Sequence, residues 1–230
     1  MCGRYNLINP DPVKLGRRFA LGESARIEER PRYNIAPTDP VLAIRQARER
    51  QVGRLRWGLI PGVWATNGGR PLINARAETL DAQPAFAASF RERRCLIPAD
   101  GFYEWLADER GKRPVWVSRP DGEPFAFAGV WASLQCDRAE PLLSCAIVTC
   151  APNELIRPIH DRMPAILTEP AEGAWLDPDA DPDELLGLLT PAGAGELELR
   201  EVSDAVNDVR RDGPELIEPR AQAADQSALF

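Results

Sequence analysis

The sequence predicts an α+β domain, built mainly from antiparallel strands with short helices at its periphery. Many short apolar runs have the length and residue types of strands, whereas the few helical segments do not alternate regularly with them. The 22 prolines and 17 glycines among 230 residues also imply many turns and rigid loops. A doubly wound parallel sheet needs crossover helices between its strands and is therefore disfavoured.

The domain organisation is expected to be simple. No internal repeat and no long low-complexity linker divides the chain, and its length is sufficient to bury a sizeable core. We therefore expect one domain over residues 1–230. The residues after Pro219, about ten in number, are expected to form a frayed tail.

Short helical segments are expected at five places. The best signalled begins at Asp11, a capping residue, with Pro12 at the first helical position. Pro84 interrupts the second segment and Pro158 limits the third, because proline cannot donate a backbone hydrogen bond. The last two carry acidic residues near their starts, which the helix dipole favours. The expected helical ranges are residues 11–20, 78–93, 153–159, 170–176 and 181–190.

Strand-like runs rich in β-branched and aromatic residues recur along the chain. Two of them, residues 40–46 and 51–60, are separated by a charged turn and are expected to pair. Residues 95–106 contain two runs joined at Asp100-Gly101. The other expected strands are residues 114–119, 124–134, 142–150 and 196–203.

The composition, with 44% hydrophobic and 27% charged residues, is that of an ordinary soluble protein. No apolar run approaches the ~18 residues that a membrane helix needs. The N-terminus lacks the basic-then-apolar pattern of a signal peptide. We therefore expect a cytoplasmic protein that does not associate with membranes, and we expect a monomer.

The five cysteines are odd in number and have no framework spacing, so reduced thiols are expected. The odd spacing of Cys145 and Cys150 along one strand-like run sends their side chains to opposite faces, which argues against a shared metal. The single histidine and the lack of a zinc-like cysteine pair also disfavour a metal site, and no cofactor is expected. The cysteines expected to be small buried apolar residues are Cys95, Cys136, Cys145 and Cys150.

Charge is distributed unevenly although the net charge is only −7. Most of the 28 basic residues lie in residues 1–120, and most of the 35 acidic residues lie in residues 121–230. All basic residues except Lys14 and Lys112 are arginines, which suit bidentate recognition of phosphate. The basic half is compatible with a nucleic-acid face and equally with an ordinary solvated surface.

Cys2, directly after the initiator methionine, is the most informative single residue. Removal of Met1 would leave Cys2 with a free α-amine and a thiol on adjacent carbons. Both groups are partly reactive near neutral pH. An aldehyde can be captured first as an imine by the nitrogen and then as a five-membered thiazolidine by the sulfur. The alternative is an ordinary frayed terminus.

Two further side chains are suited to proton transfer. His160, the only histidine, lies in a stiff polar turn with Asp161 and Arg162, where a structural or solvent-facing role is the alternative. Glu104 lies among aromatic residues, where partial desolvation would raise its pKa and make it a usable acid or base. The alternative is a strand whose Glu104 faces water.

Two segments carry residues suited to a nucleic-acid ligand. Asn74, Arg76 and Glu78 follow one another at period two, which in an extended segment places them on one face. Such a row suits a sugar oxygen and a phosphate. Pro37 and Trp64, in two loops that contain proline, could stack on or wedge between bases; a core or covering role is the alternative for Trp64.

Eight short motifs follow one another along the chain: MCGRY, RYNIAPT, RWGLIPGVW, INARAET, CLIPADGFYEW, GVW, IHDRMP and VSDAVND. Each motif is modestly specific, but eight in order, with cysteine at position 2, are very specific. Together these segments resemble the SOS response-associated peptidase (SRAP) family. The resemblance runs from residue 2 to about Pro219 and implies a barrel-like sheet.

The resemblance implies recognition of abasic sites in single-stranded DNA and crosslinking to them through the N-terminal cysteine. It implies four groups of site residues: the nucleophile Cys2, with Asn74, Glu104 and His160 at the other active-site positions; Arg4, Arg76 and Arg162 along the phosphate path; Pro37 and Trp64 as a stacking wedge; and Asn34 and Thr149 shaping the pocket. One departure is Val63, where relatives often carry an aromatic residue before Trp64, which affects the extent of the stacking platform.

The expected mechanism needs no cofactor. Glu104 would shuttle protons during ring opening and imine formation, His160 would protonate or hold the sugar hydroxyl, and Asn74 would orient Cys2 or the sugar. The resemblance also implies autoproteolytic removal of Met1 and association with the nucleoid when the protein is bound to DNA. The alternatives are a cysteine peptidase that acts on other proteins with Cys2 and His160, and a noncatalytic binder of DNA with modified bases.

Overall fold

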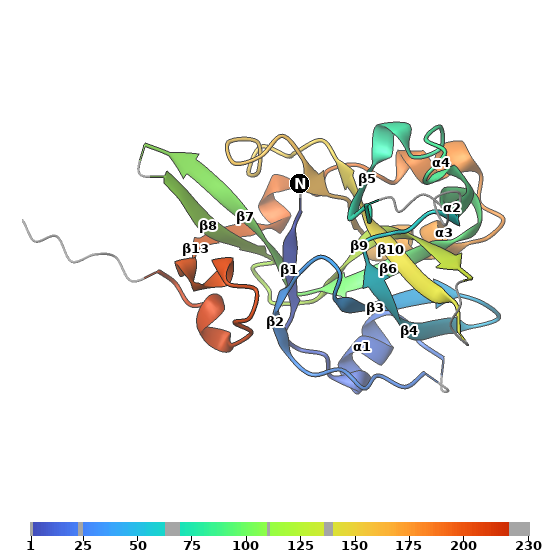
Figure 1. Ribbon diagram of the computed structural model, residues 1–230, viewed down its shortest axis with the longest axis horizontal. Helices are drawn as coiled ribbons and strands as arrows, with labels where there is room; N and C mark the ends of the chain where they lie inside the picture. The colour runs from blue at the N-terminus through green and yellow to red at the C-terminus, as the bar shows by residue number, and fades with distance from the viewer. Residues whose placement is uncertain (1, 23–24, 63–69, 110, 136–139, 221–230) are drawn as a thin grey trace, which may run out of the picture.

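Five strands close into a barrel (Figure 1) in the computed structural model, which describes residues 2–22, 25–62, 70–109, 111–135 and 140–220. Hydrogen bonding runs β10–β4–β3–β6–β9 and returns to β10, because β9 pairs with both β6 and β10. Closure leaves these strands without a free edge. The barrel strands are β3 (Pro40–Gln46), β4 (Arg50–Trp57), β6 (Arg94–Ala99), β9 (Phe125–Leu134) and β10 (Leu142–Cys150).

A second sheet of five antiparallel strands lies beside the barrel, in the order β13–β8–β7–β1–β2. Asp100 alone separates β6 from β7, so the chain passes directly from the barrel into this sheet. The Asp100 carboxylate accepts from the backbone N–H groups of Ile8 (2.6 Å) and Asn9 (3.0 Å), which fixes the chain after β1. The strands are β1 (Arg4–Leu7), β2 (Arg32–Ile35), β7 (Gly101–Asp108), β8 (Gly111–Ser118) and β13 (Glu198–Glu201).

The short strand β1 pairs with β2 and β7 in the second sheet and packs on the barrel (Figure 1). Its Tyr5 is buried and meets Trp57 and Phe127 edge-on, with ring centroids 5.4 Å and 5.6 Å away. Such aromatic pairs contribute about 1 kcal/mol each beyond their buried area. These contacts anchor the N-terminal strand on the barrel core and so fix the position of the chain start.

The helices and remaining short strands lie at the periphery. Asp11 caps the first helix by accepting from Lys14 N at 2.7 Å, as the sequence predicts. Among the described residues, no helix has the length and apolarity to cross a membrane. The helices are α1 (Pro12–Arg18), α2 (Ala87–Glu92), α3 (Glu169–Leu176) and α4 (Pro182–Gly187). The short strands are β5 (Asn74–Arg76), β11 (Met163–Pro164) and β12 (Ile166–Leu167), and the 3-10 turns are η2 (Ala77–Thr79), η3 (Ala194–Glu196), η4 (Asp204–Asn207) and η5 (Pro214–Leu216).

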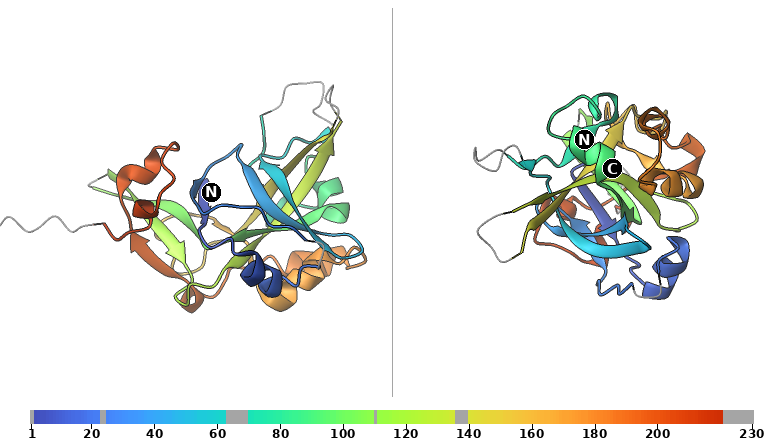
Figure 2. Two further views of the ribbon diagram at one scale, coloured as in Figure 1. Left: turned by 90° about the horizontal axis from the view of Figure 1, so that it is seen from below. Right: turned by 90° about the vertical axis from the view of Figure 1, so that its right-hand side faces the viewer.

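The C-terminal part of the described chain returns to the N-terminal strand. A second apolar cluster, made by Tyr103, Trp116, Val202, Val206 and Leu216, joins η4 and η5 to the second sheet. Figure 2 shows this segment, in red, near the N-terminus. The segment around η4 therefore lies near the start of the described chain, whereas Pro219 and Arg220 return to β13.

The fold class, a domain of mainly antiparallel strands in a barrel-like sheet with peripheral short helices, is confirmed. Two local expectations are wrong. The proline-containing loop expected around Pro37 (RYNIAPT, residues 32–38) is shorter, because Arg32–Ile35 form β2. Residues 153–159 were expected to start a helix, but they form turns, because Pro158 cannot continue the hydrogen-bond ladder.

The extended row expected for Asn74, Arg76 and Glu78 is also shorter than expected. The extended segment ends at Arg76, and Glu78 lies in η2 instead of continuing the period-two face. The helix expected over residues 181–190 ends at Gly187. Three cysteines, Cys95, Cys145 and Cys150, are free and buried as expected. Cys136 and residues 221–230 lie outside the described residues.

Candidate active site

Cys2 lies just before β1 and is completely buried. Asn74, in β5, donates from Nδ2 to the Cys2 carbonyl at 2.9 Å. The other amide atom, Asn74 Oδ1, is buried and has no hydrogen-bond partner among the described residues. Cys2 Sγ lies 3.7 Å from the Arg4 carbonyl oxygen. Asn74 therefore fixes the backbone of the candidate nucleophile and still has an acceptor to offer.

Glu104 lies on β7, next to the residue that pairs with Arg4 of β1. Its side chain is buried, so the alternative of a water-facing Glu104 is wrong. Burial raises the pKa of Glu104 to about 7. Burial, and then the charge of Glu104, raise the pKa of the Cys2 thiol. At neutral pH both the protonated and the ionised form of Glu104 are therefore populated, whereas the Cys2 thiol stays protonated.

His160 is half-buried at the start of the segment that leads into β11. Its Nδ1 accepts from the backbone N–H of Arg162 at 2.9 Å. Asp161 Oδ1 also lies 2.9 Å from Nδ1, which would require a proton on that nitrogen. We favour the backbone contact, because the Asp161 side chain is 82% exposed and burial lowers the pKa of His160. The neutral ring then carries its proton on Nε2.

The negative charge of Asp161 adds to burial in raising the pKa of Glu104. The His160 loop therefore acts on the same site as β1 and β7. The structure thus gathers four of the predicted residues: Cys2 at the start of β1, Asn74 on β5, Glu104 on β7, and His160 after β10.

The Arg162 guanidinium is held from two sides. It makes a bidentate pair with Glu78, with Nη1–Oε1 at 2.6 Å and Nη2–Oε2 at 2.9 Å. Its Nη2 also donates to the carbonyl oxygen of Thr149 and, at 3.4 Å, to Thr149 Oγ1. Only 11% of the Arg162 side chain is exposed. Arg162 lies next to His160 through its backbone N–H, and internal carboxylate and carbonyl oxygens occupy its guanidinium.

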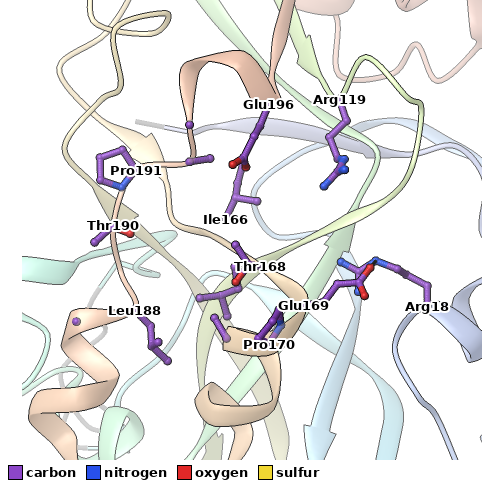
Figure 3. A pocket seen from close by; sticks show the side chains of 15 residues that line it. Arg18, Arg119, Ile166, Thr168, Glu169, Pro170, Leu188, Thr190, Pro191 and Glu196 are labelled. Carbon is purple, nitrogen blue, oxygen red and sulfur yellow. Dashed lines mark ion pairs between the residues drawn. The ribbon is translucent and has the colours of Figure 1, made fainter.

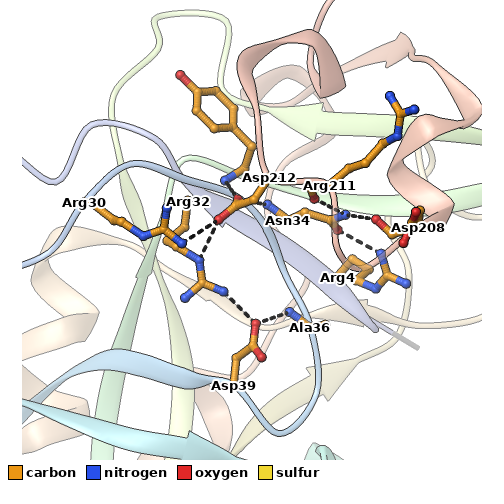
Figure 4. Close-up of polar contacts among 10 residues, drawn as sticks. Arg4, Arg30, Arg32, Asn34, Ala36, Asp39, Asp208, Arg211 and Asp212 are labelled. Carbon is orange, nitrogen blue, oxygen red and sulfur yellow. Dashed lines mark hydrogen bonds and ion pairs between the residues drawn. The ribbon is translucent and has the colours of Figure 1, made fainter.

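Arg4 and Asn34 hold the C-terminal segment against β1 and β2 (Figure 4). The buried Asn34 donates from Nδ2 to the carbonyl oxygens of Val206, Asp208 and Arg211, at 3.2, 3.1 and 2.9 Å. Arg4 Nη1 donates to Asn34 Oδ1 at 2.8 Å and to the Val206 carbonyl at 2.6 Å. Both side chains are therefore committed to internal contacts that place η4 beside the start of β1.

Asp212 is a structural residue of this region that the sequence reasoning missed. Its carboxylate accepts from the backbone N–H groups of Tyr33 (2.6 Å) and Asn34 (3.0 Å), and from Arg32 Nε (3.0 Å). Arg32 also pairs with Asp39 at 2.6 Å. No local pattern signals these contacts, because Asp212 lies about 180 residues from its partners along the chain.

Pro37 lies half-buried in a tight turn closed by Asp39 N donating to the Ala36 carbonyl at 3.1 Å. The next residue, Thr38, has φ of 80°, a conformation that costs energy for a residue with a branched side chain. Arg76 is exposed, and none of the described residues makes a hydrogen bond or ion pair with its side chain. Trp64 and Val63 lie outside the described residues.

A cleft of about 840 Å³ lies elsewhere, between α3 and the chain after α4 (Figure 3). Its arginines are internally paired, Arg18 with Glu172 and Arg119 with Asp121. None of the predicted site residues lines it. The cleft is large, but no cysteine or histidine lines it and its carboxylates are exposed, unlike the buried Glu104, so the candidate active site is the one around Cys2.

Comparison with known proteins matches residues 1–209 to the family described as SOS response associated peptidase (SRAP). Abasic site processing protein YoqW of Bacillus subtilis is 42% identical over 224 residues, covering 95% of this chain and 99% of that protein. Abasic site processing protein YedK of Escherichia coli is 32% identical, covering 82% of this chain and 84% of that protein.

Solved structures share the fold. A crystal structure of a protein from Bacteroides thetaiotaomicron has a TM-score of 0.83 at 22% identity and covers 96% of this chain and 100% of its own. Another, from Bordetella bronchiseptica, has a TM-score of 0.75 at 27% identity, covering 88% of this chain and 100% of its own. Sequence and fold agree along nearly the whole chain, and the protein belongs to the SRAP family.

Proposed function

We propose that this protein processes abasic sites in single-stranded DNA and forms a covalent thiazolidine link to them through Cys2, after removal of Met1. The observation that carries the proposal is the setting of Cys2. Asn74 holds its carbonyl at 2.9 Å, and the buried Glu104 acts electrostatically on its thiol. The relatives suggest the substrate class, since they are called abasic site processing proteins.

The chemistry needs only groups that the chain and the substrate supply. The ring-opened abasic sugar presents an aldehyde at C1′. The Cys2 amine adds to this carbon, and loss of one water gives an imine. The Cys2 sulfur then adds to the imine carbon while the thiol proton goes to the nitrogen, which closes the thiazolidine. No oxidant or reductant is consumed. The product links protein and DNA and shields the lesion.

Glu104 is suited to the proton transfers in these steps. With a pKa of about 7 it can donate a proton to the departing water and accept one from the thiol at the same pH. The thiol needs such a base, because burial raises its pKa. His160, with its neutral ring donating from Nε2, would hold the sugar hydroxyl by a hydrogen bond.

The DNA strand would follow the arginines at the site. Arg76 is the arginine most accessible to a phosphate, since its side chain is exposed. Arg162 and Arg4 would have to bind phosphate while they keep their hydrogen bonds to protein oxygens. Pro37 and Trp64 would stack on the bases flanking the lesion. Single-stranded DNA suits such a site, because the base-less nucleotide must be splayed away from its neighbours. We expect a monomer that associates with the nucleoid when bound to DNA.

The test is a crosslinking assay on a denaturing gel with abasic and intact single strands. The parent should give a shifted band with abasic DNA only, and Cys2→Ala should give none, because an amine alone forms a hydrolysable imine. Cys2→Ser should also fail, since oxygen closes a weaker ring. Cys95→Ala, which removes a buried thiol in the barrel, is the matched control and should crosslink normally.

The assay also separates the alternatives. A stable adduct with Cys2→Ala would contradict the thiazolidine. A noncatalytic DNA binder would shift native but not denaturing gels. A peptidase acting through Cys2 and His160 would cleave protein substrates and give no adduct.

A further inference from the structure

The Glu78–Arg162 pair joins two separate parts of the candidate active site. Glu78 lies in η2, directly after the strand β5 that carries Asn74. Arg162 lies between His160 and β11. The bidentate geometry, at 2.6 and 2.9 Å, fixes both the direction and the plane of the guanidinium. One ion pair therefore links the segment that holds Cys2 to the segment that carries His160.

Each of the two segments that the pair joins makes one hydrogen bond to a site residue. In the segment before Glu78, Asn74 donates to the Cys2 carbonyl at 2.9 Å. On the other side, the backbone N–H of Arg162 donates to His160 Nδ1 at 2.9 Å. The second contact decides the ring tautomer, because an occupied Nδ1 lone pair leaves the ring proton on Nε2. Movement of Arg162 would therefore disturb the donor that His160 presents.

The pair also has an electrostatic cost for DNA binding. The Glu78 carboxylate is 53% exposed and interacts electrostatically with both Arg76 and Arg162. These are two of the arginines proposed to contact phosphate. A negative charge between them weakens the attraction of a DNA strand. A negatively charged Glu78 between these two arginines therefore serves something other than DNA binding.

We propose that Glu78 is a positioning residue. Through its bidentate pair with Arg162 it fixes the His160 tautomer, and it holds the segment with Asn74 in a fixed position relative to the His160 loop. It does so at the expense of DNA affinity. The proposal rests on the proposed function for its kinetic consequences, whereas the effect on the His160 tautomer is a property of the free protein.

Two variants separate the charge of Glu78 from its geometry. Glu78→Gln removes the charge and one of the two charge-assisted bonds. Glu78→Asp keeps the charge but is shorter by one methylene, so it cannot reach both guanidinium nitrogens in the same way. Glu92→Gln, at an ion-paired glutamate on α2 with 67% of its side chain exposed, is the matched control.

The first readout is the ¹⁵N spectrum of the His160 ring in the DNA-free protein, which is unambiguous because the chain has one histidine. The parent and Glu92→Gln should show the neutral ring protonated on Nε2. Both Glu78 variants should show a mixture of tautomers. Parent-like spectra in both variants would overturn the proposal.

The second readout pairs affinity with rate. Glu78→Gln should bind intact single-stranded DNA about 2–5-fold more tightly at low salt, and Glu78→Asp should match the parent. Both should crosslink abasic DNA about 10-fold more slowly or worse under single-turnover conditions. A parent-like rate in Glu78→Asp would overturn the proposal, because charge alone would then suffice. If the parent itself gives no adduct, the proposed function fails, and the ring spectra still decide the role of Glu78.

Discussion

Replacing Glu104 by glutamine tests the electrostatics of the site in the free protein. The side chains have nearly the same shape, so the change removes the ionisable group with little repacking. Burial raises the pKa of Glu104 from 4.5 to about 7. A shift of this size corresponds to about 3 kcal/mol by which folding disfavours the charged form, at 1.36 kcal/mol for each unit.

The sign of the pH dependence follows from proton binding. Between pH 4.5 and about 7 the folded chain holds a proton on Glu104 that the unfolded chain has lost. The free energy of unfolding therefore falls as the pH rises through this window, and the full cost is present above it. Glutamine carries no such cost. Relative to the parent, Glu104→Gln should gain up to about 3 kcal/mol of stability between about pH 4.5 and pH 8.

Urea unfolding of the parent and Glu104→Gln at several pH values measures this difference. Glu92→Gln, which alters an exposed carboxylate on α2, should show a constant difference from the parent. If the difference for Glu104→Gln is equally constant, within about 0.5 kcal/mol, the raised pKa is refuted. The same variant should crosslink abasic DNA more slowly, since an amide cannot take the thiol proton.

Two further predictions concern the surroundings of the site. Asn34→Ala should lower the free energy of unfolding by about 2–3 kcal/mol in urea melts, because the carbonyl oxygens of Asp208 and Arg211 lose the Asn34 donor, whereas that of Val206 keeps Arg4. The same variant should expose residues 206–211 to hydrogen exchange, and normal protection there would contradict the docking role. Arg76→Ala should leave stability unchanged, but should reduce the salt dependence of single-strand binding by about one counterion; an unchanged slope would remove Arg76 from the DNA path.

The barrel strands could be predicted from the sequence because each is a local pattern of apolar residues bounded by turns. Their closure was indicated only by the family resemblance, because no local pattern shows that β10 pairs in parallel with β4, far away along the chain. The short strands β1 and β2 were missed for a related reason. Each has only four residues, and what makes them strands is their pairing with one another and with β7.

The site residues could be named from the sequence chiefly through the resemblance, since Cys2 and Asn74 lie 72 residues apart and no local pattern joins them. The burial of Glu104 could be anticipated from its aromatic neighbours, but a water-facing strand fitted the same pattern. Only the packing of β7 decides between the two. The partners of the arginines were beyond prediction, because a charged side chain does not reveal whether its counterion is internal or a ligand.

The preference for arginine at the site follows from these internal contacts. Arg162 meets the Glu78 carboxylate along one edge while Nη2 also reaches the Thr149 carbonyl, and Arg4 meets Asn34 and the Val206 carbonyl together. A lysine ammonium is a single point of charge and cannot hold a carboxylate and a separate carbonyl in fixed directions. In the proposed function, arginines that are oriented in this way before DNA arrives would lose little freedom on binding it. The site thus obtains a fixed geometry around Cys2 from the same residues that give it positive charge.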